Sequence, residues 1–283
     1  MPDGAAICVL GPPRSGTSLT THLLSLSGVD LGPEELLRLP APMSPLWECR
    51  PIVELNERIL VKLGGEGLTP PVPEPGWERS PEFEKEADEA RWLLDDLFAG
   101  KPLWGWKDPR TCLTLPFWRR LVPSFRYVVC LRNPHDAVAS VVEHLSMTRS
   151  QVARTWLVYV ASALVNTAGA ERTFVAYEEY FANPDSQIQQ LGRLASEGSP
   201  PPLKVRESLS AVIEERKRHF HSRTGELHAD SDFRQEVALL YLSLELLRSS
   251  SSDLDADSGG HRRALSDAVD LFAGWTLDAL RQK

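Results

Sequence analysis

Cysteine is scarce in this sequence, and the cysteines that occur are far apart. The four are Cys8, Cys49, Cys112 and Cys130, with no C-x-x-C pair among them. This spacing argues against a zinc site and against a disulfide framework. The start of the sequence also lacks a basic segment followed by an apolar stretch, the pattern of a signal peptide. We therefore expect a protein of a reducing, cytoplasmic compartment.

Long apolar runs and an excess of positive charge are also missing. No run approaches the roughly 18 apolar residues that a membrane-spanning helix needs. The formal net charge of -8 argues against broad binding to nucleic acid or to an anionic membrane. Any anionic ligand would therefore need a local basic pocket.

What the sequence does contain is an alternation of strand and helix patterns. Short β-prone runs occur at 5–10, 127–131 and 172–180, and residues 103–110 read as a strand end that runs into a turn. Helical patterns separate them, including 17–27, 51–63, 82–99 and 150–168. This order predicts an α/β fold, a P-loop-like three-layer αβα sandwich with a mainly parallel central sheet. The 283 residues suffice for one large α/β domain, so we expect a single domain over 1–283.

Two segments interrupt this pattern. Residues 30–50 contain four prolines, and residues 64–81 are rich in proline and glycine. We expect both, within 30–81, to be lid or surface excursions that select a substrate. Residues 197–283 are predicted to be mostly helical, with a mobile low-complexity loop at 249–260. Leu26 is assigned to the buried face of the first helix, and Trp92 to that of helix 82–99.

The first strand leads into "GPPRSGTS", residues 11–18, which nearly fits the phosphate-binding pattern G-x-x-x-x-G-K-[ST]. Gly11, Gly16 and Ser18 match the pattern. Thr17 occupies the place of the lysine, and a different cation, Arg14, comes three residues earlier.

Such a loop attracts anions for three reasons. Its backbone N–H groups and the helix dipole favour negative charge. Arg14 can bind phosphate oxygens bidentately, and Ser15, Thr17 and Ser18 supply hydroxyl donors. Taken alone, the segment could also be a turn that merely begins a helix.

Four motifs in order, "PPRSGTS", "WKDPR", "LRNPHDAVAS" and "VAYEEY", resemble the sulfotransferases that use 3'-phosphoadenosine 5'-phosphosulfate (PAPS). The resemblance covers roughly residues 5–190. The loop with Arg14 is similar to the bacterial and tyrosylprotein types rather than to the cytosolic aryl type. A phosphosulfate carries less charge than a triphosphate, which suits a loop without the lysine.

The resemblance implies a set of nucleotide-binding residues. Arg132 and Ser140, eight residues apart, match the pair that binds the 3'-phosphate. Tyr177 matches a tyrosine near the nucleotide, and Arg223 lies in a basic segment that would close over it. Taken singly, Arg132 could be a surface ion pair, Ser140 a helix-surface hydroxyl, Tyr177 a core aromatic, and the basic run a solvated helix face.

The resemblance also implies catalytic residues. Lys107 matches a lysine that faces the departing oxygen, where a cation stabilises developing charge. Asp108 would orient Lys107 or cap the following turn. Glu35, 21 residues after Arg14, is the first choice for the general base, and Glu48 is the second. Either glutamate could instead be an exposed carboxylate at a helix start.

We therefore expect an enzyme that moves a sulfuryl group from PAPS to a hydroxyl, less readily an amine, without a metal. The acceptor would be a small molecule, a glycan or a lipid. One alternative is an atypical P-loop kinase with Ser18 and a strand-end aspartate as magnesium ligands, but no aspartate is expected after a strand in the required place. A second alternative is a non-catalytic nucleotide-binding protein.

Overall fold

The computed structural model describes residues 2–37, 46–122, 124–143, 145–195, 203–214, 227, 230, 232–249 and 258–282. Four strands form one parallel sheet in the order β2-β1-β3-β4. They are β1 (Ala5–Leu10), β2 (Leu103–Lys107), β3 (Phe125–Leu131) and β4 (Arg172–Ala176). The predicted α/β class with a parallel sheet is confirmed. The last strand is shorter than predicted, because a turn after Ala176 leads into the next helix.

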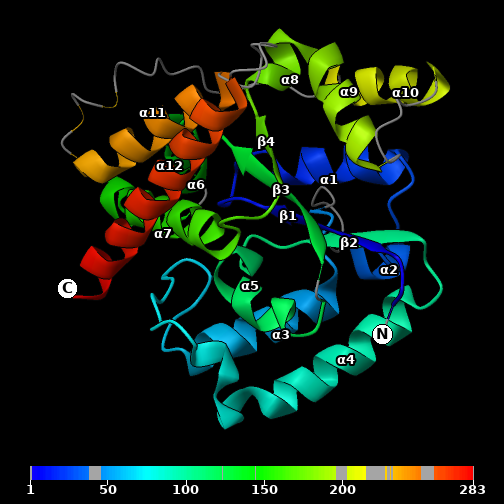
Figure 1. Ribbon diagram of the computed structural model, residues 1–283, viewed down its shortest axis with the longest axis horizontal. Coiled ribbons are helices and arrows are strands. Elements are labelled where there is room, and N and C mark those ends of the chain that lie inside the picture. The colour runs from blue at the N-terminus through cyan, green and yellow to red at the C-terminus, as the bar shows by residue number, and fades with distance from the viewer. Residues whose placement is uncertain are drawn as a thin grey trace.

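Helices cover both faces of the sheet (Figure 1). The chain crosses from β1 to β2 toward one edge, and from β2 through β3 to β4 toward the other. Because such crossovers are right-handed, the helix that directly follows β1 and the helices of the next two connections lie on opposite faces. The first connection carries α1 (Thr17–Leu26), α2 (Glu34–Leu37), α3 (Arg50–Lys62) and α4 (Glu84–Phe98). The next two carry α5 (Thr111–Arg119), α6 (Pro134–Val142) and α7 (Arg149–Asn166).

After β4 the chain returns to the face that α1 covers, so the layers are helix, sheet and helix as predicted. The helices there are α8 (Glu179–Ala182), α9 (Pro184–Ala195) and α10 (Leu203–Glu214). Two further helices, α11 (Gln235–Ser249) and α12 (Ser258–Arg281), pack beside α7. The described residues after 203 are mostly helical, as predicted, and α12 begins inside the segment expected to be a loop.

A buried ion pair ties α12 to the sheet. Arg172, the first residue of β4, donates from Nη1 and Nη2 to the two carboxylate oxygens of Asp270, at 2.7 and 2.9 Å. Both side chains are buried. A bidentate arginine–carboxylate pair fixes the orientation of both partners, so α12 is held at the amino end of β4.

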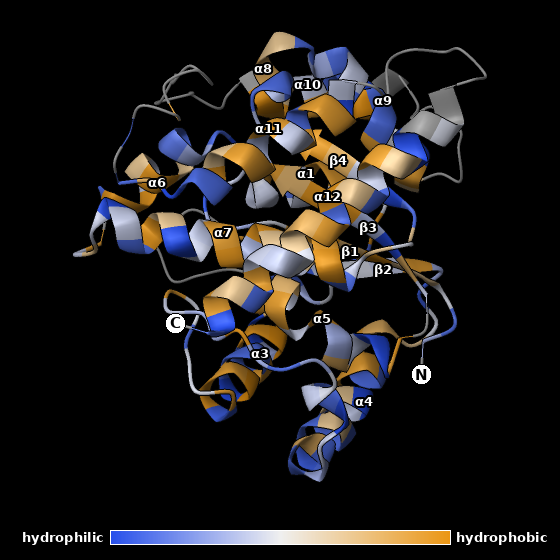
Figure 2. Cartoon of the chain, turned by 60° about the vertical axis from the view of Figure 1, so that its left-hand side comes forward, coloured by the Kyte–Doolittle hydropathy of each residue, from blue (hydrophilic) through white to orange (hydrophobic). Residues whose placement is uncertain are grey.

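Apolar residues gather on the strands and on the helix faces that point toward them (Figure 2). Two of the predicted core positions are wrong. Trp92 is 66 % exposed, because Ala90 and Leu94 of α4 face the core and a residue midway between them points away. Leu26 is partly exposed because it is the last residue of α1.

The excursion at 64–81 is attached to α7 rather than free in solvent. Thr155 Oγ1 donates to the carbonyl oxygen of Leu68 at 2.7 Å, and Tyr159 Oη donates to that of Gly67 at 2.7 Å. Two short 3-10 turns, η1 (Trp77–Arg79) and η2 (Pro81–Phe83), lead from it into α4. In the other excursion, residues 38–45 lie outside the described part of the chain.

Candidate active site

The loop after β1 has the backbone that its glycines predict. Gly16 has φ 84°, and a Cβ placed on it would lie 2.6 Å from Cδ2 of Tyr177. Only glycine therefore fits here without strain. Arg14 also has a positive φ, 66°. A non-glycine residue in this region is under strain, and such residues cluster at functional sites. Strand, loop and helix are thus arranged as predicted.

This loop meets the carboxyl end of β3. Arg132, the residue after β3, donates from Nη1 to the carbonyl oxygen of Arg14 at 2.9 Å. Arg14 Nε in turn donates to Ser140 Oγ of α6 at 2.9 Å. The connections leave β1 and β3 in opposite directions, so the crevice between their carboxyl ends is where this class of sheet binds ligands. Arg14, Arg132 and Ser140 are thus brought together there.

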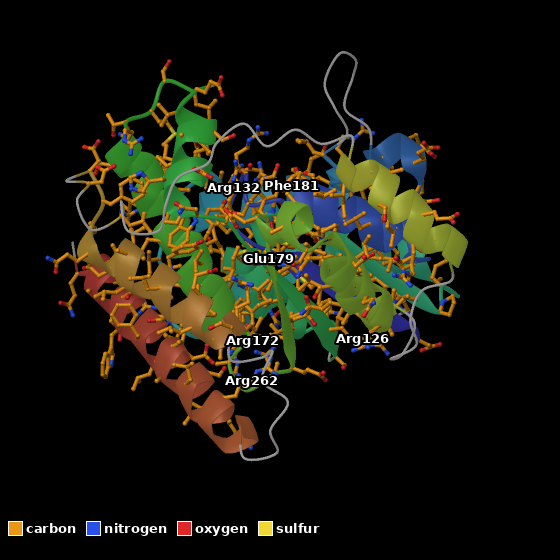
Figure 3. All side chains as sticks on the ribbon, turned by 90° about the horizontal axis from the view of Figure 1, so that it is seen from above. Arg126, Arg132, Arg172, Glu179, Phe181 and Arg262 are labelled. Carbon is orange, nitrogen blue, oxygen red and sulfur yellow. The ribbon has the colours of Figure 1, made fainter. Side chains whose placement is uncertain are left out.

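Tyr177 completes this cluster from the end of β4. Its ring centroid lies 4.4 Å from Cζ of Arg132, and Phe181 packs edge-on against it. Figure 3 labels Arg132 and Phe181, the two residues that contact Tyr177. Arg132 is only 6 % exposed, so it is not the surface residue of the alternative interpretation.

Two buried donors in the cluster have no protein partner in the described part of the chain. They are Ser15 Oγ and Arg132 Nε. Buried polar groups are nearly always hydrogen-bonded, so each of these atoms needs an explanation. Burial lowers the pKa of Arg132, because it removes water from around the charged guanidinium. Donors and guanidinium groups of this kind fit the oxygens of a phosphate or sulfate group.

Lys107 lies on the other side of the loop, at the end of β2. Its side chain is 1 % exposed. Nζ donates to Glu48 Oε1 at 2.6 Å and to Ser18 Oγ at 3.3 Å. Burial lowers the pKa of Lys107, and the negative charge of Glu48 partly opposes this shift. Lys107, Ser18 and Glu48 are therefore brought together beside the loop.

Contacts with α1 hold Glu48 in this place. Ser18 Oγ donates to the carbonyl oxygen of Leu46 at 3.1 Å. Trp47 stacks on His22 of α1, with ring centroids 4.3 Å apart and planes 16° from parallel. Trp47 itself has φ 57°, so the chain turns sharply just before Glu48.

Of the other predicted site residues that the structure describes, Thr17 belongs to the loop and Glu35 to α2. Glu35 is exposed on α2, and within the described residues no hydrogen bond or ion pair joins it to Lys107 or to the loop. Thr17 is buried at the start of α1. Arg223 lies outside the described residues.

Asp108 corrects one expectation, because an aspartate does directly follow a strand. It is fully buried after β2. One carboxylate oxygen accepts from Asn56 Nδ2 at 2.8 Å, and the other accepts from the backbone N–H and from Nη1 of Arg110 at 3.1 and 2.8 Å. Both oxygens are thus engaged in capping the turn before α5 and in holding Arg110, which does not favour a magnesium ligand.

The sequence interpretation missed Arg110 and Asn56. Arg110 hydrogen-bonds Glu57 and Asp108, and its Nη1 lies 3.9 Å from Glu48 Oε2. Burial alone would lower the pKa of Arg110, but the carboxylates of Asp108 and Glu57 raise it above its ordinary value. Because Arg110 ends the motif "WKDPR", the sequence offered a signal for it. Asn56 is a single polar residue on an amphipathic helix and carries no such signal.

Comparison with known proteins connects this geometry to a family. Residues 77–196 match the model of the sulfotransferase family. This part of the chain is similar to the sulfotransferase family. The matched residues include Lys107, Arg132, Ser140 and Tyr177, whereas the loop with Arg14 and the segment with Glu48 precede the match. The resemblance inferred from the motifs is confirmed.

Solved sulfotransferase structures are also similar to the chain. One, from Mycobacterium avium, has 15% identity and a TM-score of 0.47, over 79% of this chain and 70% of that one. A sulfotransferase domain from the olefin synthase of Synechococcus PCC 7002 has 18% identity and a TM-score of 0.42, over 86% of this chain and 96% of that one. A search of curated proteins found no significant match. Among the described residues, no helix is both long and apolar enough to cross a membrane.

Proposed function

We propose that the protein transfers a sulfuryl group from PAPS to a hydroxyl acceptor. The family match supports sulfotransfer in general. The observation that carries the proposal for this donor is the cluster of Arg14, Arg132, Ser140 and Tyr177 around two unpartnered buried donors. An amine remains the less favoured acceptor.

The residues present fit a nucleotide with phosphate groups at both ends of the ribose. The loop N–H groups, Ser15 and Arg14 would bind the 5' end, because they lie at the N-terminus of α1. Arg132 and Ser140 would bind the 3'-phosphate from the end of β3 and the first turns of α6. Arg14 bridges the two subsites through its hydrogen bond to Ser140.

PAPS, when bound, supplies an electrophilic sulfuryl group and a phosphate leaving group. The acceptor oxygen forms a bond to sulfur as the bond from sulfur to the phosphate oxygen breaks. The acceptor proton passes to a carboxylate, and the products are a sulfate ester and the 3',5'-bisphosphate. Lys107, buried beside the loop, would stabilise the charge that develops on the leaving oxygen.

Glu48 is the better candidate for the base that accepts this proton. It is joined to Lys107 and lies near Arg110, whereas Glu35 is exposed on α2. A general base must lie within hydrogen-bond reach of the proton that it takes. The role of Glu35, the first choice from the sequence, stays a prediction that the substitutions below test.

Calorimetry tests the donor site. We expect the protein to bind 3',5'-bisphosphoadenosine (PAP) without magnesium, and Arg132→Ala to lose this binding by about tenfold or more, since charged hydrogen bonds are worth about 1.5–3 kcal/mol. Arg126→Ala is the matched control, because Arg126 lies at the opposite end of the same strand (Figure 3). Binding of ATP with magnesium and none of PAP would overturn the proposal and favour the kinase.

A further inference from the structure

Glu48 lies between two cations of the motif "WKDPR". Its Oε1 accepts from Lys107 Nζ at 2.6 Å, and its Oε2 lies 3.9 Å from Nη1 of Arg110. The side chains of Glu48 and Arg110 are 17 % and 23 % exposed, so water screens their attraction less than on an open surface. The proposed reaction gives a role to Lys107 but leaves Arg110 without one.

Arg110 is held in place by groups other than Glu48. Its Nε donates to Glu57 Oε1, and its Nη1 donates to Asp108 Oδ1 at 2.8 Å. Asp108 is itself fully buried, and its other oxygen accepts from Asn56 Nδ2 at 2.8 Å. A planar guanidinium that is bound through different N–H groups keeps its orientation. Arg110 is therefore a fixed positive charge beside the carboxylate of Glu48.

The excursion at 64–81 covers the same guanidinium. A Cβ placed on Gly67 would lie 3.1 Å from Arg110 Nε and 3.5 Å from Glu57 Oε1. Tyr159 Oη donates to the carbonyl oxygen of Gly67 at 2.7 Å and holds this backbone against α7. Arg110 is thus confined by the excursion as well, and it has little room to move away from its carboxylate partners.

The proposed reaction requires Lys107 to leave Glu48. The side chain of Lys107 is 1 % exposed, and separating it from a carboxylate at 2.6 Å costs free energy because little water is there to solvate either charge. A carboxylate without another counter-charge would retain the lysine or move with it. A second, fixed cation lowers this cost, since the carboxylate keeps a counter-charge after Lys107 has left. Arg110 meets this requirement.

We propose that Arg110 is the positioning residue of this site: it keeps Glu48 in place while Lys107 moves to the leaving oxygen of the donor. Arg110 competes with Lys107 for the carboxylate and touches no reacting atom. Lys107 is thereby available to the 5'-phosphate, and Glu48 stays where it takes the acceptor proton. This inference rests on the proposed function, because it needs the 5'-phosphate of the donor beside Lys107.

Calorimetry with PAP tests the inference without an acceptor, because PAP carries the 5'-phosphate to which Lys107 moves. Arg110→Met should weaken PAP binding by about twofold to fivefold, the worth of a partly exposed ion pair, since Lys107 then stays with Glu48. In the Glu48→Gln background the same substitution should have no measurable effect, because a neutral amide does not retain Lys107. A merely structural role of Arg110 would instead weaken PAP binding equally in both backgrounds.

Two further variants complete the comparison. Arg120→Met is the matched control, because Arg120 lies at the other end of α5 and pairs with Glu84, so PAP affinity should be unchanged. Arg110→Lys keeps the positive charge and takes the place of Arg110→Met where the latter does not fold. A lysine lacks the planar fork that binds both carboxylate partners, so PAP should bind more weakly than to the wild type, and again only when residue 48 is glutamate.

A crystal structure of the PAP complex gives the direct readout. We expect Lys107 Nζ on the 5'-phosphate, and Glu48 still paired with Arg110. A complex in which Glu48 remains bonded to Lys107, or equal losses of PAP affinity in the two backgrounds, would overturn the inference while the proposed function stands. Wild-type protein that binds no PAP would overturn the proposed function, and this inference with it.

Discussion

Lys107 Nζ lies 2.6 Å from Glu48 Oε1, so the residue that ends β2 is paired with a carboxylate from the segment before α3. Lys107 is buried, and desolvation there disfavours its charge. The pair keeps both charges compensated until substrates arrive. In the proposed reaction the two groups separate, with Lys107 serving the leaving oxygen and Glu48 the acceptor proton.

Glu48→Gln should lower kcat by about 10²–10⁴, the range for a general base. It should leave PAP affinity within about threefold, because Glu48 lies outside the cluster of Arg14 and Arg132. Glu35→Gln is the paired variant and should change kcat by less than about threefold, since an exposed substitution away from the chemistry is nearly neutral. PAP release from PAPS with a phenolic acceptor gives kcat, and calorimetry gives affinity. A large loss in Glu35→Gln alone would restore Glu35 as the base.

The pH dependence should reflect Lys107. Because burial lowers its pKa, Lys107 should lose its proton, and kcat should fall, at a pH below the ordinary lysine value of about 10.4. Lys107→Arg should remove this alkaline fall, whatever its effect on the maximum, because a guanidinium stays protonated. The measurement is the pH profile of kcat for both proteins, and an identical alkaline fall in the two would exclude Lys107 as its cause.

The lowered pKa of Lys107 also makes the free energy of unfolding depend on pH, in a direction that follows from the shift. Between the lowered pKa of the folded state and about 10.4, the unfolded protein binds more protons at this residue, so its contribution to the free energy of unfolding rises with pH. Below the lowered pKa the contribution is constant. Urea unfolding of wild type and Lys107→Met across this window should show the difference, with the wild type gaining relative stability as pH rises.

Gly16→Ala should destabilise the protein more than Gly76→Ala. Both glycines have φ near +85°, at 84° and 89°, so both substitutions carry the strain of the left-handed region, about 1–2 kcal/mol. Only at Gly16 would the new methyl group meet another side chain, at 2.6 Å from Tyr177. Thermal unfolding should therefore separate the two variants, and only Gly16→Ala should lose PAP affinity. Equal melting temperatures would show that the Tyr177 side chain moves aside at little cost in free energy.

Asn56→Leu should destabilise the fold by about 2–4 kcal/mol, because it leaves buried partners unsatisfied. Asn56 donates to Asp108 and Thr111, and accepts from Thr114 Oγ1 at 2.6 Å and Trp118 Nε1 at 2.8 Å. Glu54→Ala, an exposed change on the same helix, should stay within about 0.5 kcal/mol of wild type. Urea denaturation measures both, and equal midpoints would refute the importance of this network.

The sequence predicted the site best where the residues that carry the chemistry belong to recognisable local motifs. The glycine loop and the strand ends predicted that Arg14, Arg132 and Ser140 would meet, because parallel strands bring their carboxyl ends to one edge. It was less informative about Glu48. A spacing of 21 residues favoured Glu35, but the path of a proline-broken segment depends on contacts such as Trp47 on His22, which no local pattern predicts.

Tertiary packing also explains the other differences. Trp92 fits the apolar pattern of a helix and is nevertheless exposed. The sequence alone does not show which face of α4 packs against the rest of the protein. Asp108 caps the following turn, one of the two roles expected for it, but its partner Asn56 comes from α3 and could not be predicted from the local sequence.

The Arg172–Asp270 pair means that the sulfotransferase match does not mark a unit that can fold alone. The match spans 77–196, but β1 lies before it and Asp270 after it. A fragment limited to the match would lose the strand between β2 and β3 and would leave Arg172 charged and unpaired at the sheet. Shortening the protein from either end should therefore abolish cooperative unfolding before it alters the chemistry of the site.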